Sequence, residues 1–152
     1  HPSYQSLTKP ELILLEKLQL SKVSQTEIYS SRFHFLRLSF PESFISLNQY
    51  DIQIDQSVGY YDQPGFPSST CQPYNFFDVL NNQALPLIIQ PFVWMDSMNK
   101  YYRKISIEEE KEELYQLKEL IRKYKGHFSV VFHNDSMTDR RYRMLLKTLL
   151  YS

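Results

Sequence analysis

Four stretches of the chain have the pattern of capped helices. Each begins with Ser or Thr, has Glu or Asp three residues later, and continues with apolar residues at helical spacing. These stretches are residues 8–20, 39–51, 106–126 and 136–152. In the third stretch, glutamates occupy the first turns and basic residues the last, which suits the helix dipole. Gly126 is expected to supply the left-handed residue that ends this helix.

Short runs rich in aromatic and branched residues lie between these stretches and predict strands. The runs are residues 28–38, 57–60, 85–95 and 128–133. Because helices and strands alternate, we expect βα units on a parallel sheet. The last two runs lack apolar–polar alternation and are expected to be parallel neighbours joined by the helix near 106–125. Residues 62–82 contain three prolines and are expected to form a long irregular loop.

Two polar residues stand at predicted strand ends, where parallel sheets present their functional groups. His133 closes the run "FSVVFH", and Asp62 follows "SVGYY". A hydrogen-bonded core histidine is an equally valid interpretation of His133. In residues 28–38, strand alternation would place Arg32, His34 and Leu36 on one face. A buried polar pair on one face requires partners or a cavity.

Composition narrows the class of protein. With 152 residues, of which 42% are hydrophobic, the chain is expected to form a single domain over residues 1–152. Its 17 basic and 17 acidic side chains cancel, which argues against nucleic acid as a partner. No apolar run approaches the roughly 20 residues of a membrane span. Cys71 is the single cysteine, which excludes an internal disulfide.

The common catalytic motifs do not occur in this sequence. It has no glycine-rich phosphate loop, no G-x-S-x-G elbow and no H-E-x-x-H pair. His, Asp and Arg residues are instead dispersed at predicted strand ends. Such dispersion is typical of a barrel-type metal hydrolase, in which each strand contributes one group.

Five segments together resemble a known family. In chain order they are "HPSY", "SRFHFLRLSFPES", "GYYDQPGFPSSTCQPYNFFD", "QPFVWMDSM" and "FSVVFHND". Their order resembles the carboxyl-terminal two-thirds of a bacterial branch of the polysaccharide deacetylases, the carbohydrate esterase family 4-like enzymes. The resemblance implies an α/β fold, a partial distorted (β/α) barrel with parallel strands. It also implies metal-dependent N-deacetylation of an acetylated amino sugar in a polysaccharide or its precursor, in the bacterial cytoplasm.

Site residues follow from the resemblance only where this sequence matches the family's motifs. His133 would be the catalytic acid that protonates the departing amine. The remaining assignments are Asp62 and Arg37 as catalytic partners, Arg32 and Tyr61 as substrate-binding residues, and His1 and His34 as ligands of a divalent metal, with zinc favoured.

The metal motif departs from the family pattern. The family has a second histidine four places after the first, and Gln5 stands in that position. Its acidic motif, which supplies the base and an aspartate ligand, is expected to precede His1. We therefore expect residues 1–152 to be the carboxyl-terminal part of a longer deacetylase-like domain and to be inactive alone. The exposed sheet edge of a partial barrel would allow a homodimer.

Two further hypotheses remain open. The chain could form a deacetylase-like domain that has lost catalysis and binds glycan or a protein, which Gln5 favours. The presence of both Asp62 and His133 favours the hypothesis of an active enzyme instead. The third hypothesis is that the chain shares only the fold of this family and that its histidines are hydrogen-bonded within the core.

Overall fold

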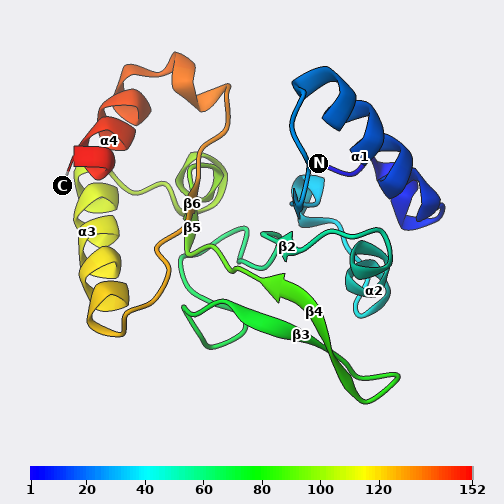
Figure 1. The fold of residues 1–152 in the computed structure, drawn as a ribbon. Coiled ribbons are helices and arrows are strands. Elements are labelled where there is room, and N and C mark those ends of the chain that lie inside the picture. The colour runs from blue at the N-terminus through cyan, green and yellow to red at the C-terminus, as the bar shows by residue number, and fades with distance from the viewer. Residues whose placement is uncertain (152) are drawn as a thin grey trace. The chain divides into compact units, whose positions relative to one another are not determined.

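The computed structural model describes residues 1–151, which form two compact units (Figure 1). The first unit comprises His1–Val58 and Pro73–Gln90. The second comprises Gly59–Gln72 and the chain from Pro91 onward. Both units mix helices with parallel strands, so the fold is of the mixed α/β kind that the alternating pattern predicts.

The first unit contains a four-stranded sheet in the order β1-β2-β4-β3. Its strands are β1 (Ser30–Ser31), β2 (Ile54–Asp55), β3 (Tyr74–Asp78) and β4 (Gln83–Ile89), and its helices are α1 (Glu11–Ser24) and α2 (Glu42–Gln49). The β1, β2 and β4 strands are parallel, with Ser30 opposite Ile54 and Ile54 opposite Ile88. The β3 strand runs antiparallel to β4, and the two form a hairpin (Figure 1).

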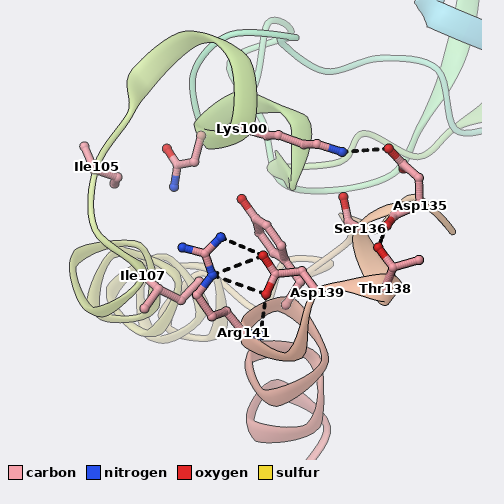
Figure 2. Close-up of a pocket in the computed structure, with 10 residues that line it drawn as sticks. Lys100, Ile105, Ile107, Asp135, Ser136, Thr138, Asp139 and Arg141 are labelled. Carbon is pink, nitrogen blue, oxygen red and sulfur yellow. Dashed lines mark hydrogen bonds and ion pairs between the residues drawn. The ribbon is translucent and has the colours of Figure 1, made fainter.

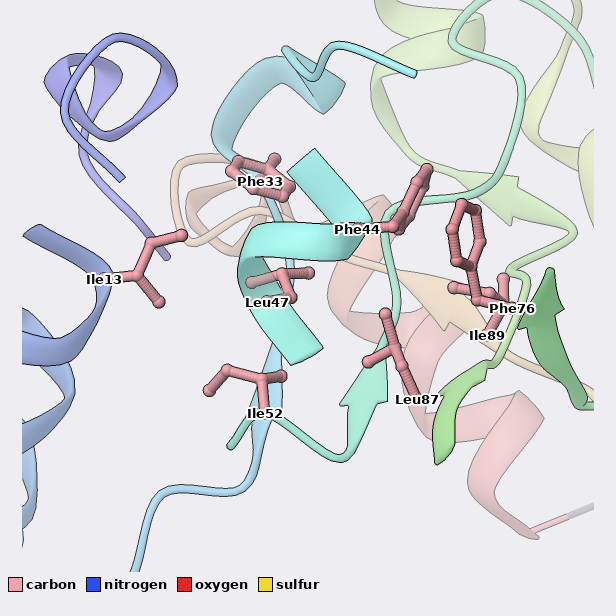
Figure 3. Close-up of a cluster of buried hydrophobic side chains, with 8 residues drawn as sticks. All are labelled: Ile13, Phe33, Phe44, Leu47, Ile52, Phe76, Leu87 and Ile89. Carbon is pink, nitrogen blue, oxygen red and sulfur yellow. The ribbon is translucent and has the colours of Figure 1, made fainter. Parts of the chain in front are cut away.

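Apolar side chains from these helices and strands form the core of the first unit (Figure 3). Leu47 of α2 and Leu87 of β4 are almost fully buried. The Phe44 and Phe76 rings pack with their centroids 4.8 Å apart. Burying a side chain of this size stabilises the fold by about 1.5–3 kcal/mol. The core therefore joins α2 to the sheet edge formed by the hairpin.

The second unit contains a two-stranded parallel sheet and two helices. Its elements are β5 (Trp94–Met95), the π-helical turn η3 (Met98–Arg103), α3 (Ile107–Lys123), β6 (Val130–Val131), the 3-10 turn η4 (Ser136–Thr138) and α4 (Arg140–Tyr151). Trp94 pairs with Val130 and Met95 with Val131. The α3 and α4 helices lie side by side (Figure 1), and Lys118 donates to the Leu149 carbonyl at 3.4 Å. The predicted parallel pairing of the two runs is confirmed for these residues. The run 85–95, however, is divided between β4 and β5.

Among the four predicted capping boxes, the one at Ser106 and Glu109 is confirmed. The Ser106 hydroxyl accepts from the Glu109 N–H, and the Glu109 carboxylate accepts from the Ser106 N–H at 2.8 Å. The helix does not end at a left-handed Gly126, because Lys125 has the positive φ of 52°. Gly126 is instead needed for space, since a Cβ there would lie 2.2 Å from the Cys71 Sγ.

The other three capping predictions are wrong. The α1 and α2 helices begin after Pro10 and Pro41, and neither has a side-chain cap. Proline suits the first turn of a helix because its φ is already helical and it has no N–H that needs a partner. The α4 helix begins after Asp139, whose carboxylate accepts the Arg141 N–H at 2.8 Å. Ser136 therefore starts the short η4 turn and does not cap α4.

The strand predicted at 28–38 ends at Ser31, so the predicted alternation of Arg32, His34 and Leu36 is wrong. The Phe33 N–H donates to the Ser57 hydroxyl at 2.9 Å. The chain then enters a 3-10 turn, His34–Leu36, in which Phe35 and Leu36 have positive φ angles of 56° and 53°.

Two other strand predictions also fail. Residues 57–60 follow the strand β2 and do not form one themselves. Residues 62–82, predicted to be irregular, contain β3. Its hairpin turn has no glycine, because the Asp78 carboxylate accepts the N–H groups of Leu80 and Asn81, and Asn82 adopts a φ of 51°. Asx turns of this kind replace the usual Gly-containing turn.

Candidate functional site

His133 lies two residues after the end of β6, in the second unit. Its side chain is 43% exposed, which excludes the interpretation of an enclosed core histidine. It therefore stands past the carboxyl end of a parallel strand, as the sequence predicts, with part of its ring open to solvent.

Asp96 holds His133 in place through both oxygens of one carboxylate. Asp96 directly follows β5, and its side chain is 0% exposed. One oxygen accepts the His133 backbone N–H at 2.7 Å, and the other lies 2.5 Å from the Nδ1 of the ring. Because Met95 pairs with Val131 in the parallel sheet, the residues that follow the two strands meet at the same edge.

The contact with Asp96 determines which ring nitrogen of His133 is available. When the carboxylate accepts both bonds, Nδ1 has the hydrogen and Nε2 is left for a substrate. A buried carboxylate on Nδ1 fixes the orientation of an imidazole and compensates its charge when the ring has two protons. This His133–Asp96 pair is the arrangement expected of a general acid or base.

Asp96 was not among the residues selected from the sequence. It closes the run "PFVWM" in the same way that His133 closes "FSVVF". The expectation that functional residues follow the ends of parallel strands, which identifies His133, therefore applies equally to Asp96.

Two further buried ionisable groups, Glu110 and Tyr142, are close enough to Asp96 to be affected by its charge. Glu110 is 1% exposed, and burial raises its pKa to about 7, against the opposing effects of Asn99 and Arg103. Burial, together with the charges of Glu110 and Asp96, raises the pKa of Tyr142 to about 12. The Trp94 indole N–H and one Glu110 oxygen are buried without a hydrogen-bond partner among the described residues. Buried groups of this kind with shifted pKa values are common near functional sites.

Residues 59–66, which include Tyr61 and Asp62, are anchored at two glycines. At Gly59 an added Cβ would lie 2.2 Å from the Phe92 ring, so only glycine fits. Gly65 has a φ of 135°, and its N–H donates to the Val93 carbonyl at 2.9 Å. The segment is thereby fixed to the chain that leads into β5.

Tyr61 and Asp62 both belong to the second unit, as His133 does. Tyr61 is exposed and meets the Tyr102 ring edge-on, with 5.3 Å between centroids. Asp62 is half-buried. Over residues 1–151, no hydrogen bond or ion pair joins Asp62 to His133; the partner of His133 is Asp96. That Asp62 acts beside His133 stays a prediction.

Arg32 lies in the first unit, beside a buried acid that the sequence analysis did not select. Asp55 ends β2, and Ser57 donates to its carboxylate from the backbone N–H at 2.9 Å and from the hydroxyl at 2.8 Å. Burial raises the pKa of Asp55 to about 6, while Ser57 and the Arg32 charge oppose this rise. Burial lowers the pKa of Arg32, and the Asp55 charge opposes that change.

The predicted metal ligands and Arg37 gather on the surface of the first unit. The His1 and His34 rings have centroids 5.4 Å apart and meet edge-on. Tyr4 packs against His34, and the Arg37 guanidinium lies 5.3 Å from the centroid of the Tyr4 ring. Phe35, at the left-handed turn, is exposed beside them. We name these five residues the aromatic surface cluster.

The described residues bring together fewer ligands than a catalytic metal usually has. A catalytic zinc site has three protein ligands and one open position. Within the described part of the chain, no group of three or more His, Cys, Asp or Glu side chains could hold an ion. His1 and His34 together supply two imidazoles.

Comparison with known proteins adds no further assignment. The chain matches no family model, and no curated protein and no solved structure is significantly similar to it. In residues 1–151, no helix is both long enough and apolar enough to cross a membrane.

Proposed function

We propose that this chain is part of an enzyme that removes the acetyl group from an N-acetylated amino sugar, with His133 as the general acid. The observation that supports the proposal is the contact between His133 and the buried Asp96 carboxylate, which accepts from the backbone N–H and lies 2.5 Å from Nδ1. A histidine so held, 43% exposed and past a strand end, is suited to proton transfer at a substrate.

The chemistry explains why a histidine is needed. Water adds to the acetamide carbonyl, and the tetrahedral intermediate collapses by breaking the C–N bond. The leaving amine departs readily only if it receives a proton. In the proposed role, His133 gives the Nε2 proton to this nitrogen, and the Asp96 carboxylate keeps the ring oriented through Nδ1. The base for the attacking water is not assigned to any residue of this chain.

The finer fold assignment, a partial distorted (β/α) barrel of the polysaccharide deacetylase type, belongs to the same proposal. It is supported by the parallel pairing in both sheets and by polar side chains at the carboxyl ends of β2, β5 and β6. The antiparallel β3 strand is a departure from a regular barrel.

Acetate release from N-acetylated oligosaccharides by the intact gene product tests the proposal. His133→Gln should lower turnover by on the order of 10²–10⁴, because an acid catalyst is lost. The melting temperature should remain unchanged, because the glutamine amide can donate to the buried Asp96 carboxylate in place of Nδ1 and a side chain that is 43% exposed contributes little packing. His127→Gln is the matched control. Normal activity per folded molecule in His133→Gln would exclude the acid role.

A second candidate function is glycan binding without catalysis. The aromatic surface cluster favours it, because exposed aromatic rings beside an arginine suit the apolar faces of sugars. The two-imidazole limit on metal binding also favours it. Under this hypothesis the intact protein binds oligosaccharides without releasing acetate, and Phe35→Ala weakens that binding.

A further inference from the structure

The α1 helix, which belongs to the first unit (Figure 1), exposes leucine side chains to solvent. Leu15 is 52% exposed and Leu18 is 56% exposed, and Leu14 beside them is 37% exposed. A surface helix of a globular protein normally directs its polar residues to water and its apolar residues to the core. Neighbouring apolar side chains that are exposed in this way mark a contact site for another molecule.

The opposite side of α1 attaches the helix to its own unit. Ile13 is 4% exposed and belongs to the core (Figure 3). On the next turn, the Glu16 carboxylate accepts the Ser3 N–H at 2.9 Å. The Lys17 ammonium group donates to the Asp51 carbonyl at 2.9 Å. These three side chains of α1 hold one side of the helix against the first unit and leave the leucines of the other side uncovered.

Four residues form a row along the uncovered side of α1. They are separated by four, three and four positions, and they are Glu11, Leu15, Leu18 and Lys22. At about 100° per residue they lie within about 60° of one another, on the side of the helix away from Ile13. This is the spacing of a coiled-coil seam, whose apolar positions are covered by a second helix. We name these four residues the α1 seam.

The charges of the α1 seam are suited to a second copy of the same helix. Glu11 begins the helix and Lys22 lies in its last turn, while the positions that flank the seam are the uncharged Leu12, Leu14, Gln19 and Ser21. An antiparallel copy would bring Glu11 opposite Lys22 of the second copy at both ends of the pair. A parallel copy would instead bring like charges together at both ends. The seam is therefore complementary to itself in the antiparallel orientation.

Both charges of the α1 seam are available to such a partner. In the second unit, Lys100 is already paired with Asp135 at 2.7 Å (Figure 2). In contrast, none of the ion pairs within residues 1–151 includes Glu11 or Lys22, and both residues are exposed. Exposed ion pairs add little affinity, but they do determine the orientation and register of an interface.

We propose that two copies of this chain associate through the α1 seam as an antiparallel helix pair related by a two-fold axis. Leu15 packs against Leu18 of the second copy, and the two-fold axis repeats this contact. The pair buries less surface than a standard interface, so the dimer is weak, with a Kd of about 1–100 µM. The inference does not depend on the proposed reaction, and the contact is distinct from one through a sheet edge.

Sedimentation velocity of the intact gene product at a series of concentrations tests the proposal. The wild-type protein should show a reversible equilibrium between monomer and dimer. Leu18→Glu should be monomeric at every concentration and keep its helical circular dichroism, because this side chain is 56% exposed. Val23→Glu is the matched control, since Val23 is 82% exposed on the same helix but lies outside the seam. It should dimerise as the wild type does.

Three results would overturn the α1 contact. The first is a wild-type protein that remains monomeric over the whole series, as expected if another segment of the gene product covers α1. The second is a folded Leu18→Glu protein that dimerises as tightly as the wild type. The third is an equal loss of the dimer in Val23→Glu, which would mean that the association does not use the seam.

Charge reversal tests the antiparallel orientation and does not require a change at the leucines. Lys22→Glu places a carboxylate opposite Glu11 at both ends and should weaken the dimer about tenfold. Adding Glu11→Lys to Lys22→Glu restores opposite charges and should recover most of the lost affinity. In a parallel pair, like charges would face each other in all three proteins and affinity would hardly change. Equal affinity of the wild type and Lys22→Glu, or no recovery in the double variant, would therefore refute the antiparallel pair.

Discussion

At the scale of single residues, Glu110 is the clearest source of pH-dependent stability. It is 1% exposed, one of its oxygens has no hydrogen-bond partner among the described residues, and burial raises its pKa from 4.5 to about 7. Between these two values the unfolded chain has lost the Glu110 proton and the folded chain has kept it. The free energy of unfolding therefore falls as pH rises through this window, with a limiting slope of about 1.4 kcal/mol per pH unit.

Glu110→Gln should remove this contribution. We expect the variant to gain stability relative to the wild-type protein as pH rises from about 4.5 to about 7, because glutamine is neutral throughout. Urea unfolding at several pH values measures the difference. Glu112→Gln, at an exposed position of the same helix, should show no such trend. If the free energies of unfolding of Glu110→Gln and of the wild type differ by the same amount at every pH in this window, Glu110 is ionised in the folded protein.

The site could be predicted from sequence only where a residue lies one or two positions past the end of a strand. His133 fits this rule, and Asp96 fits it equally well after β5. Asp62 fits it only if residues 57–60 form a strand, and they do not. The contact of Asp96 with His133 depends on the register of two short parallel strands, which no local pattern specifies.

At the scale of elements, the α3 helix has the one complete capping box among those predicted. Ser106→Ala removes the acceptor for the Glu109 N–H and should lower the free energy of unfolding by about 1 kcal/mol. Thermal unfolding measures the change. Ser21→Ala, inside α1, should have a smaller effect or none. Equal effects of the two substitutions would show that the Ser106 cap does not stabilise the fold.

Helices were more predictable than strands because their pattern is local. The α3 helix combines charge order, cap and apolar stripe within one stretch of sequence. The β3–β4 hairpin could not be recognised because its turn relies on the Asp78 carboxylate and a left-handed Asn82, without glycine. The strands β1, β2, β5 and β6 have two residues each, so their pairing depends on partners far away in the sequence.

At the scale of the whole molecule, residues 1–152 alone should release no acetate and retain no stoichiometric zinc after dialysis. The described residues bring together two imidazoles, His1 and His34, against the usual three protein ligands of a catalytic zinc. Elemental analysis and an acetate assay on this polypeptide measure both properties. Bound zinc together with turnover would show that the ligand set lies elsewhere in the chain.

The central claim is that Asp96 acts on the substrate only through His133. A double-mutant cycle in the intact gene product tests this claim most directly, with acetate release measured for His133→Gln, Asp96→Asn and the double variant, each corrected for its folded fraction. Residues that act as one unit show strongly non-additive losses. We therefore predict that the double variant is no slower than His133→Gln alone. Losses that multiply, so that Asp96→Asn slows a His133→Gln protein as much as it slows the wild type, would contradict the account.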